Sequence, residues 1–138
     1  MNFLTKEIKI DNKLVAIIFK YKKEKFKGIS FFTNKILNLQ VGLMVHGKNH
    51  TIKPHIHLNK KKVIKQMSEL LIIFSGKLKV FFYNKKKIKT KSIILNKRDM
   101  ILLISGIHGF KVLKNLEMIE IKQGPFFKKK DKVLLENF

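Results

Sequence analysis

Residues 69–84 read ELLIIFSGKLKVFFYN, and this stretch contains two short apolar runs, 70–74 and 78–83. The tripeptide Ser75-Gly76-Lys77 between them predicts a turn or hairpin loop. Short runs rich in Ile, Leu, Val, Phe and Tyr that are separated by turn residues are typical of β-strands in an all-β sandwich or barrel.

The same pattern continues on both sides of this stretch. Further apolar or alternating runs occupy residues 14–21, 28–33, 40–46, 92–95, 100–104, 110–113 and 118–122. No window predicts an amphipathic helix, and residues 34–39 are expected to be a connector because an isolated helix needs about 12 residues. No repeat of fixed period is present, which argues against a propeller or solenoid. We therefore expect antiparallel strands that close on themselves.

A chain of 138 residues with 45% hydrophobic residues is long enough for one domain with one core. We expect N-terminal strands and a connector over 1–39, a barrel over 40–126 and a tail over 127–138. The first residues reach charged side chains before any apolar run of signal-peptide length, and no segment has the roughly 18–20 apolar residues of a membrane span. A cytoplasmic protein that does not associate with membranes is the expectation.

The formal net charge is +22, but only one of the 31 basic residues, Arg98, is an arginine. Arginine is the preferred residue for reading phosphates and bases, so no specific nucleic-acid partner is expected. The lysines accompany abundant Ile, Asn and Phe, which is the codon bias of an AT-rich genome. Their residual effect would be a positive field that steers anionic small molecules.

Four of the five histidines lie between His46 and His57, and the fifth is His108. In His55-Ile56-His57 the spacing of two residues places both imidazoles on one face of a strand. The chain has no cysteine, so a metal ion would need histidine and carboxylate ligands. Glu69 is the natural third ligand and His108 the fourth. His46 and His50 fall in an expected turn and are interpreted as exposed.

These residues resemble the two motifs of the cupin superfamily. Gly47 precedes Pro54-His55-Ile56-His57, and Glu69 is followed by six residues and then Gly76. The second motif corresponds to residues 98–110, in which Gly106 shortly precedes His108. Residues 54–57, 105–110 and 120–126 look more narrowly like a group of small bacterial cupins encoded among genes for surface polysaccharides and nucleotide sugars.

The resemblance implies a single jelly-roll β-barrel of two antiparallel sheets that holds one divalent transition metal on His55, His57, Glu69 and His108. Zinc, iron, nickel, cobalt and manganese all suit this ligand set. The sequence departs from the family in three places. Eleven residues separate His57 from Glu69, far more than in the common motif, Arg98 stands where glycine is frequent, and one residue rather than two separates Gly106 from His108.

The reaction expected is isomerisation, epimerisation or a related proton transfer on a small, anionic, sugar-derived substrate, with the ion as Lewis acid. Glu120 or Tyr83 would move the proton, and Gln66 and Lys122 would contact the substrate. The alternatives are a non-catalytic ligand-binding or metal-binding module, such as a sensor or partner subunit, and an iron-dependent dioxygenase. A homodimer is expected, formed through N-terminal strands within residues 8–21, since pairing there would cover a sheet edge.

Overall fold

The computed structural model describes residues 2–59, 61, 63–64, 66–124 and 133–135. Within these residues every regular element is a strand, so the predicted all-β class is confirmed. The strands are β1 (Asn2–Ile10), β2 (Lys13–Lys22), β3 (Gly28–Phe31), β4 (Gly42–Val45), β5 (Glu69–Tyr83), β6 (Lys89–Asn96), β7 (Met100–Leu103) and β8 (Ile107–Lys122). Of the expected tail, 127–138, only residues 133–135 are described, and residues 125 and 126 of the third signature also lie outside the described part.

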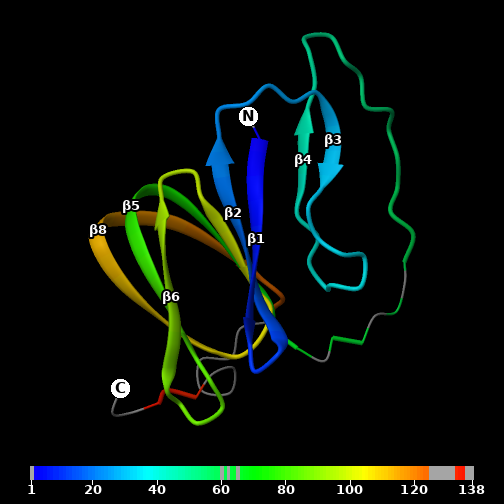
Figure 1. Ribbon diagram of the computed structural model, residues 1–138. Coiled ribbons are helices and arrows are strands. Elements are labelled where there is room, and N and C mark those ends of the chain that lie inside the picture. Colours follow the sequence, from blue (N-terminus) through cyan, green and yellow to red (C-terminus); the bar gives the residue numbers. More distant parts are fainter. Residues whose placement is uncertain (1, 60, 62, 65, 125–132, 136–138) are drawn as a thin grey trace.

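Strand β5 is the centre of a six-stranded antiparallel sheet (Figure 1). On one edge its first residues pair with β7 and its last residues pair with β6. On the other edge it pairs with β8 along its whole length. Strands β2 and β1 extend the sheet beyond β7, whereas β3 and β4 form a small separate sheet.

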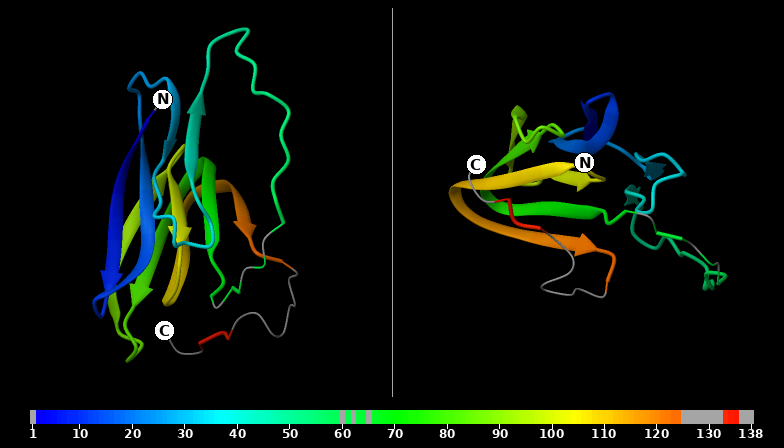
Figure 2. Two further views of the ribbon diagram at one scale, coloured as in Figure 1. Left: turned by 90° about the vertical axis from the view of Figure 1, so that its right-hand side faces the viewer. Right: turned by 90° about the horizontal axis from the view of Figure 1, so that it is seen from below.

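The sheet curls because β5 and β8 bend together (Figure 2). The irregular part of their pairing lies around Gly76. Gly76 has a φ of +84°, and a Cβ at this position would overlap the carbonyl oxygen of Asn115 on β8. The pairing of β5 with β8 shifts register three times between Ile73 and Leu78. As a result the buried side chains lie at odd positions before the bend and at even positions after it. The predicted turn at 75–77 is therefore wrong: the chain bends there, but β5 continues to Tyr83.

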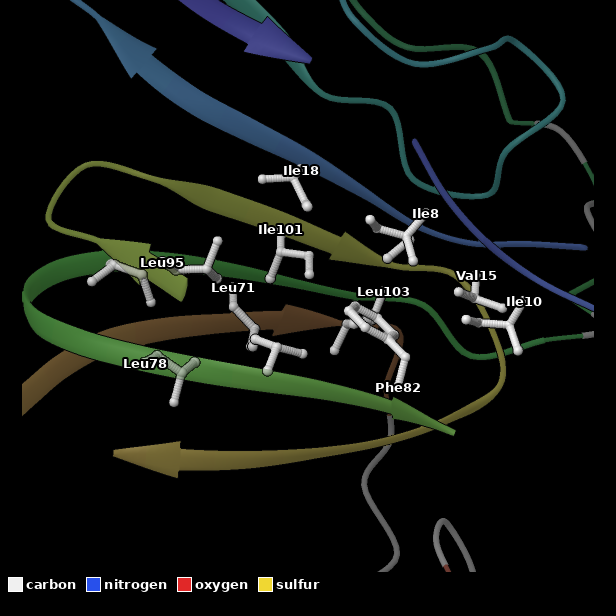
Figure 3. Packing of buried hydrophobic residues seen from close by; sticks show 13 residues of the cluster. Ile8, Ile10, Val15, Ile18, Leu71, Leu78, Phe82, Leu95, Ile101 and Leu103 are labelled. Atoms are coloured by element: carbon white, nitrogen blue, oxygen red, sulfur yellow. The ribbon is translucent and has the colours of Figure 1, made fainter. Parts of the chain in front are cut away.

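The main core lies between the two halves of the curled sheet (Figure 3). Its fully buried side chains come from β2, β5, β6 and β7 and include Ile18, Leu71, Leu78, Phe82, Leu95 and Ile101. Burial of each such side chain contributes roughly 1.5–3 kcal/mol relative to exposure. The curl therefore has an energetic cause, because it lets one sheet bury its own inner face.

A second cluster covers the opposite face of β2 and β7. Ile17, Phe19 and Leu102 are buried there against Phe32, Leu37, Leu39 and Val41 from the chain that connects β3 to β4. Residues 34–39 are turns rather than a helix, as expected of a connector. The described residues contain no helix with the length and apolarity that a membrane crossing requires.

Candidate functional site

A cavity of about 1040 Å³ lies where the two ends of β5 approach the two ends of β8. Six of the eight predicted site residues line it: Gln66, Glu69, Tyr83, His108, Glu120 and Lys122. The apolar part of its wall had not been singled out from the sequence and consists of Met67, Leu103, Ile107, Phe110 and residues 133–135. An apolar wall with a few convergent polar groups is typical of small-molecule sites.

The bend of the sheet brings Glu69 and His108 together. Glu69 begins β5 and pairs with Lys122, whereas His108 pairs with Phe82 near the far end of β5. Nevertheless His108 Nε2 lies 3.6 Å from Glu69 Oε2, and each side chain is 27% exposed. This contact therefore crosses the cavity between the two halves of the curled sheet.

The imidazole of His108 is held by its own strand. Its Nδ1 lies 3.2 Å from the carbonyl oxygen of Gly106, and its ring packs against Phe110 with centroids 5.4 Å apart. In the tautomer in which Nδ1 carries the proton, this contact is a hydrogen bond and Nε2 presents its lone pair to Glu69. The ring is thus oriented with a proton-accepting or metal-binding nitrogen toward the carboxylate.

Glu120 and Lys122 supply one negative and one positive group on the same face of β8. Lys122 Nζ lies 3.1 Å from Glu120 Oε1, and the two side chains are only partly exposed. Lys122 is also directly opposite Glu69 in the pairing of β5 with β8. With Glu69 and His108, the cavity wall combines two carboxylates, one ammonium and one imidazole.

Tyr83 and Gln66 lie at the margins of the cavity. Tyr83 ends β5, and its ring lies beside Gly109, where the missing side chain leaves room for it. Gln66 is exposed in the chain before β5, and its backbone carbonyl accepts a hydrogen bond of 3.4 Å from Asn38 Nδ2. Both side chains are therefore placed to contact the edge of a bound ligand rather than to surround it.

His55 and His57 lie elsewhere. They belong to the exposed chain between β4 and β5, which runs apart from the curled sheet (Figure 1). Their ring centroids are 5.2 Å apart, and His55 Nδ1 contacts the carbonyl oxygen of Lys53 at 2.9 Å. Among the described residues no three His, Cys, Asp or Glu side chains are grouped so that they could hold a metal ion. The structure therefore forms two pairs from the four predicted ligands, His55 with His57 and Glu69 with His108.

The other two histidines of this segment also form a pair. The rings of His46 and His50 are stacked, with centroids 4.0 Å apart and planes inclined by 3°. His46 Nε2 is buried without a hydrogen-bond partner in the described structure. The interpretation of His46 as an exposed turn residue missed this half-buried environment at the end of β4.

Comparison with protein-family models, curated proteins and solved structures returned no match to this chain.

Proposed function

We propose that this chain is a small cupin that binds one divalent transition metal and acts on a small, anionic, sugar-derived substrate in the cavity at the ends of β5 and β8. The observation that carries the proposal is the approach of His108 Nε2 to Glu69 Oε2 at 3.6 Å. This separation is too long for a hydrogen bond. Two ligand atoms about 2.1 Å from one tetrahedral ion lie about 3.4 Å apart, so the pair has the spacing of two metal ligands.

The surroundings of the histidines support the same proposal. A metal-binding histidine usually donates its other ring N–H to a carbonyl or carboxylate, which fixes its orientation. His108 has this arrangement through Gly106, and His55 has it through Lys53. Glu69 and His108 would hold the ion in the cavity, and His55 and His57 would complete the ligand set.

For His55 and His57 to bind the same ion as Glu69 and His108, the chain before β5 must reach β8. Contact between this segment and β8 would be favourable for both. One edge of β8 pairs with β5, and no strand in the described residues pairs with its other edge. Val112 on β8 is 55% exposed and Ile56 is 84% exposed. Addition of residues 53–58 to this edge would satisfy backbone hydrogen-bonding groups, bury apolar surface on both sides and complete a second sheet of a jelly roll.

The ion would polarise a carbonyl or hydroxyl oxygen of the substrate as a Lewis acid. Lys122 would attract an anionic group, and Glu120, which lies 3.1 Å from it, would accept or return a proton. Tyr83 at the margin would donate a hydrogen bond, and Gln66 would contact the substrate from the chain before β5. Isomerisation or epimerisation beside a carbonyl needs this combination of a base and an electrophile.

The decisive experiment is elemental analysis of protein purified without chelators or nickel resin. We expect about one equivalent of a transition metal in the wild type, and none in His55→Ala/His57→Ala. The matched control is His46→Ala/His50→Ala, which removes the other two histidines of the same segment and should keep the metal. A folded wild type without metal, or equal loss in both double variants, would contradict the proposal.

Docking of the segment has its own readout. Chymotrypsin cleaves after large apolar residues, and Leu58, which is 78% exposed, lies in the segment that would dock. Addition of the metal should slow cleavage at Leu58 in the wild type, because a paired strand is a poor substrate, and should leave cleavage of His55→Ala/His57→Ala unchanged. Cleavage that is insensitive to metal in both proteins would show that the segment does not dock.

A second candidate function, proton transfer without a metal, is favoured by the same contact. With Nδ1 bound to Gly106, neutral His108 offers Nε2 as a general base, and Glu69 would stabilise the imidazolium that forms. Turnover of a sugar-derived substrate by metal-free protein, abolished in His108→Gln, would favour this candidate over the metal-dependent one.

A further inference from the structure

The outer face of the half-sheet formed by the end of β5, β6 and the start of β8 carries positive charge without any acidic residue. Residues 77–97 contain eight lysines, residues 107–116 contain two, and neither stretch contains Asp or Glu. Val80 and Phe82 are buried in the core, and the residues that alternate with them on β5, Lys79 and Phe81, point outward. Tyr83 at the end of this face lines the margin of the cavity, but the four lysines described below do not line it.

Two pairs of lysines lie directly opposite each other on this face. Lys77 pairs with Lys114, and Lys79 pairs with Lys111, in the antiparallel register of β5 and β8. Directly opposite side chains project to the same face, and like charges in such positions are destabilising. None of the four has an ion pair among the residues that the structure describes. The fold thus places four ammonium groups close together without a counter-charge from the described residues. A bound polyanion would supply the negative charge.

An aromatic ring lies beside this group. Phe81 follows Lys79 on the same face, and the Nζ atoms of Lys79 and Lys89 lie 5.3 and 5.2 Å from its ring centroid. Directly opposite Phe81 on β8 is Gly109, and the ring of Tyr83 lies beside that glycine, so the face carries two aromatic rings. Alternate residues of one strand are about 6.8 Å apart, a spacing that successive phosphates of an extended single strand can match.

We infer that this face binds single-stranded nucleic acid without sequence preference. Lys77, Lys79, Lys111 and Lys114 would contact successive phosphates, and Phe81 would stack on a base. Positive grooves that follow the backbone and aromatic rings that stack on bases are the two components of sequence-independent single-strand recognition. The ring separates this partner from other polyanions, since polyphosphate and anionic membranes have no base to stack.

The test is fluorescence anisotropy with a labelled twelve-nucleotide oligo(dT) at several salt concentrations. The face variant carries Lys77→Gln, Lys79→Gln, Lys111→Gln and Lys114→Gln. The matched control carries Lys23→Gln, Lys25→Gln, Lys27→Gln and Lys48→Gln at exposed positions elsewhere, and so changes the net charge equally. Loss of four phosphate contacts should flatten the slope of log affinity against log salt by about 3 in the face variant, and by much less in the control.

A third variant, Phe81→Leu, tests the base contact. We expect it to weaken oligo(dT) binding by roughly 5–100-fold and to leave binding of inorganic polyphosphate unchanged. Equal losses in the face variant and its control would overturn the inference, because binding would then follow net charge alone. No effect of Phe81→Leu on oligo(dT) would overturn it too, since the face would then be a general polyanion surface. Neither result bears on the metal content, which tests the proposed function separately.

Discussion

Arg98 shows how a single residue departs from the ordinary geometry of its position. It has a φ of +72°, in the left-handed region that favours glycine. Its backbone N–H donates to the carbonyl oxygen of Ile73 at 2.8 Å, so the turn before β7 is tied to β5. Its guanidinium lies over the ring of Tyr21 at 5.0 Å and donates to the Tyr21 hydroxyl at 3.2 Å. The side chain thus offsets part of the conformational cost of the turn.

We expect Arg98→Gly to be more stable than Arg98→Ala by about 1 kcal/mol. Both variants lose the contact with Tyr21, but only glycine relieves the cost of the left-handed conformation. Relative to the wild type, loss of an exposed contact between a cation and a ring costs about 0.5–1 kcal/mol, so Arg98→Gly should be close to neutral. Urea unfolding of the three proteins measures both differences. Equal stability of the two variants would show that Arg98 is not strained.

Among the elements, β5 and β8 decide the fold because they bend as a pair. The apolar runs of the sequence predicted most strands within a few residues, but the same residue types serve a hairpin turn and a strand bend. Ser75, Gly76 and Lys77 therefore indicated a change of direction without showing whether the chain reverses. The backbone of Asn115 on β8 lies against Gly76, and this contact shows that the chain bends there rather than reverses. Asn115 is far from Gly76 in the sequence, so the local residues could not indicate the contact.

Gly76→Ala should destabilise the protein by at least about 3 kcal/mol. The variant combines a positive φ, which costs an alanine roughly 1–2 kcal/mol, with an overlap between its Cβ and the backbone of β8 at Asn115 that only a shift of a strand can relieve. The control is Gly47→Ala, where no atom lies within 4 Å of the added Cβ and φ is not positive. Chemical denaturation should show a change within about 0.5 kcal/mol for this control. A similarly small change for Gly76→Ala would mean that β5 does not bend at this residue.

The site was predicted less completely than the strands, for a physical reason. Glu69, Glu120 and Lys122 lie on strands whose alternation indicates which face they share, and the cavity brings them together with His108. His55 and His57 have the same alternation, but their exposed segment has no paired neighbour among the described residues. A period of two residues defines a face only where a sheet is present, so the spacing alone could not place them in the cavity.

At the scale of the whole molecule, charge repulsion opposes compact folding. The net charge is +22, and the ion pairs of Lys9 with Glu7 and of Lys22 with Glu24 are exposed to solvent. An exception is the pair of Lys20 with Asp99, which are 2.6 Å apart with the carboxylate buried. Asp99 also accepts the backbone N–H groups of Tyr21 and Asn96, so it fixes the start of β7. With 31 basic residues against nine acidic ones, the acidic side chains can compensate only a part of the positive charge.

Added sodium chloride should therefore stabilise the protein. The Debye length falls from about 30 Å at 0.01 M to about 10 Å at 0.1 M salt, which screens the lysines from one another. The opposed pairs of Lys77 with Lys114 and Lys79 with Lys111 alone cost about 1 kcal/mol together. Directly opposite residues are about 5 Å apart, which is less than the Debye length, so salt screens only part of this repulsion and should raise Tm by about 1–2 °C. Thermal unfolding across this salt range measures the shift. The Tm of the face variant, with glutamine at positions 77, 79, 111 and 114, should rise less than that of the control variant, with glutamine at positions 23, 25, 27 and 48. A Tm that stays constant or falls with salt would mean that the repulsion between lysines is already relieved within the fold. An equal response of the two variants would mean that the repulsion is spread over the surface rather than concentrated on the face of β5 and β8.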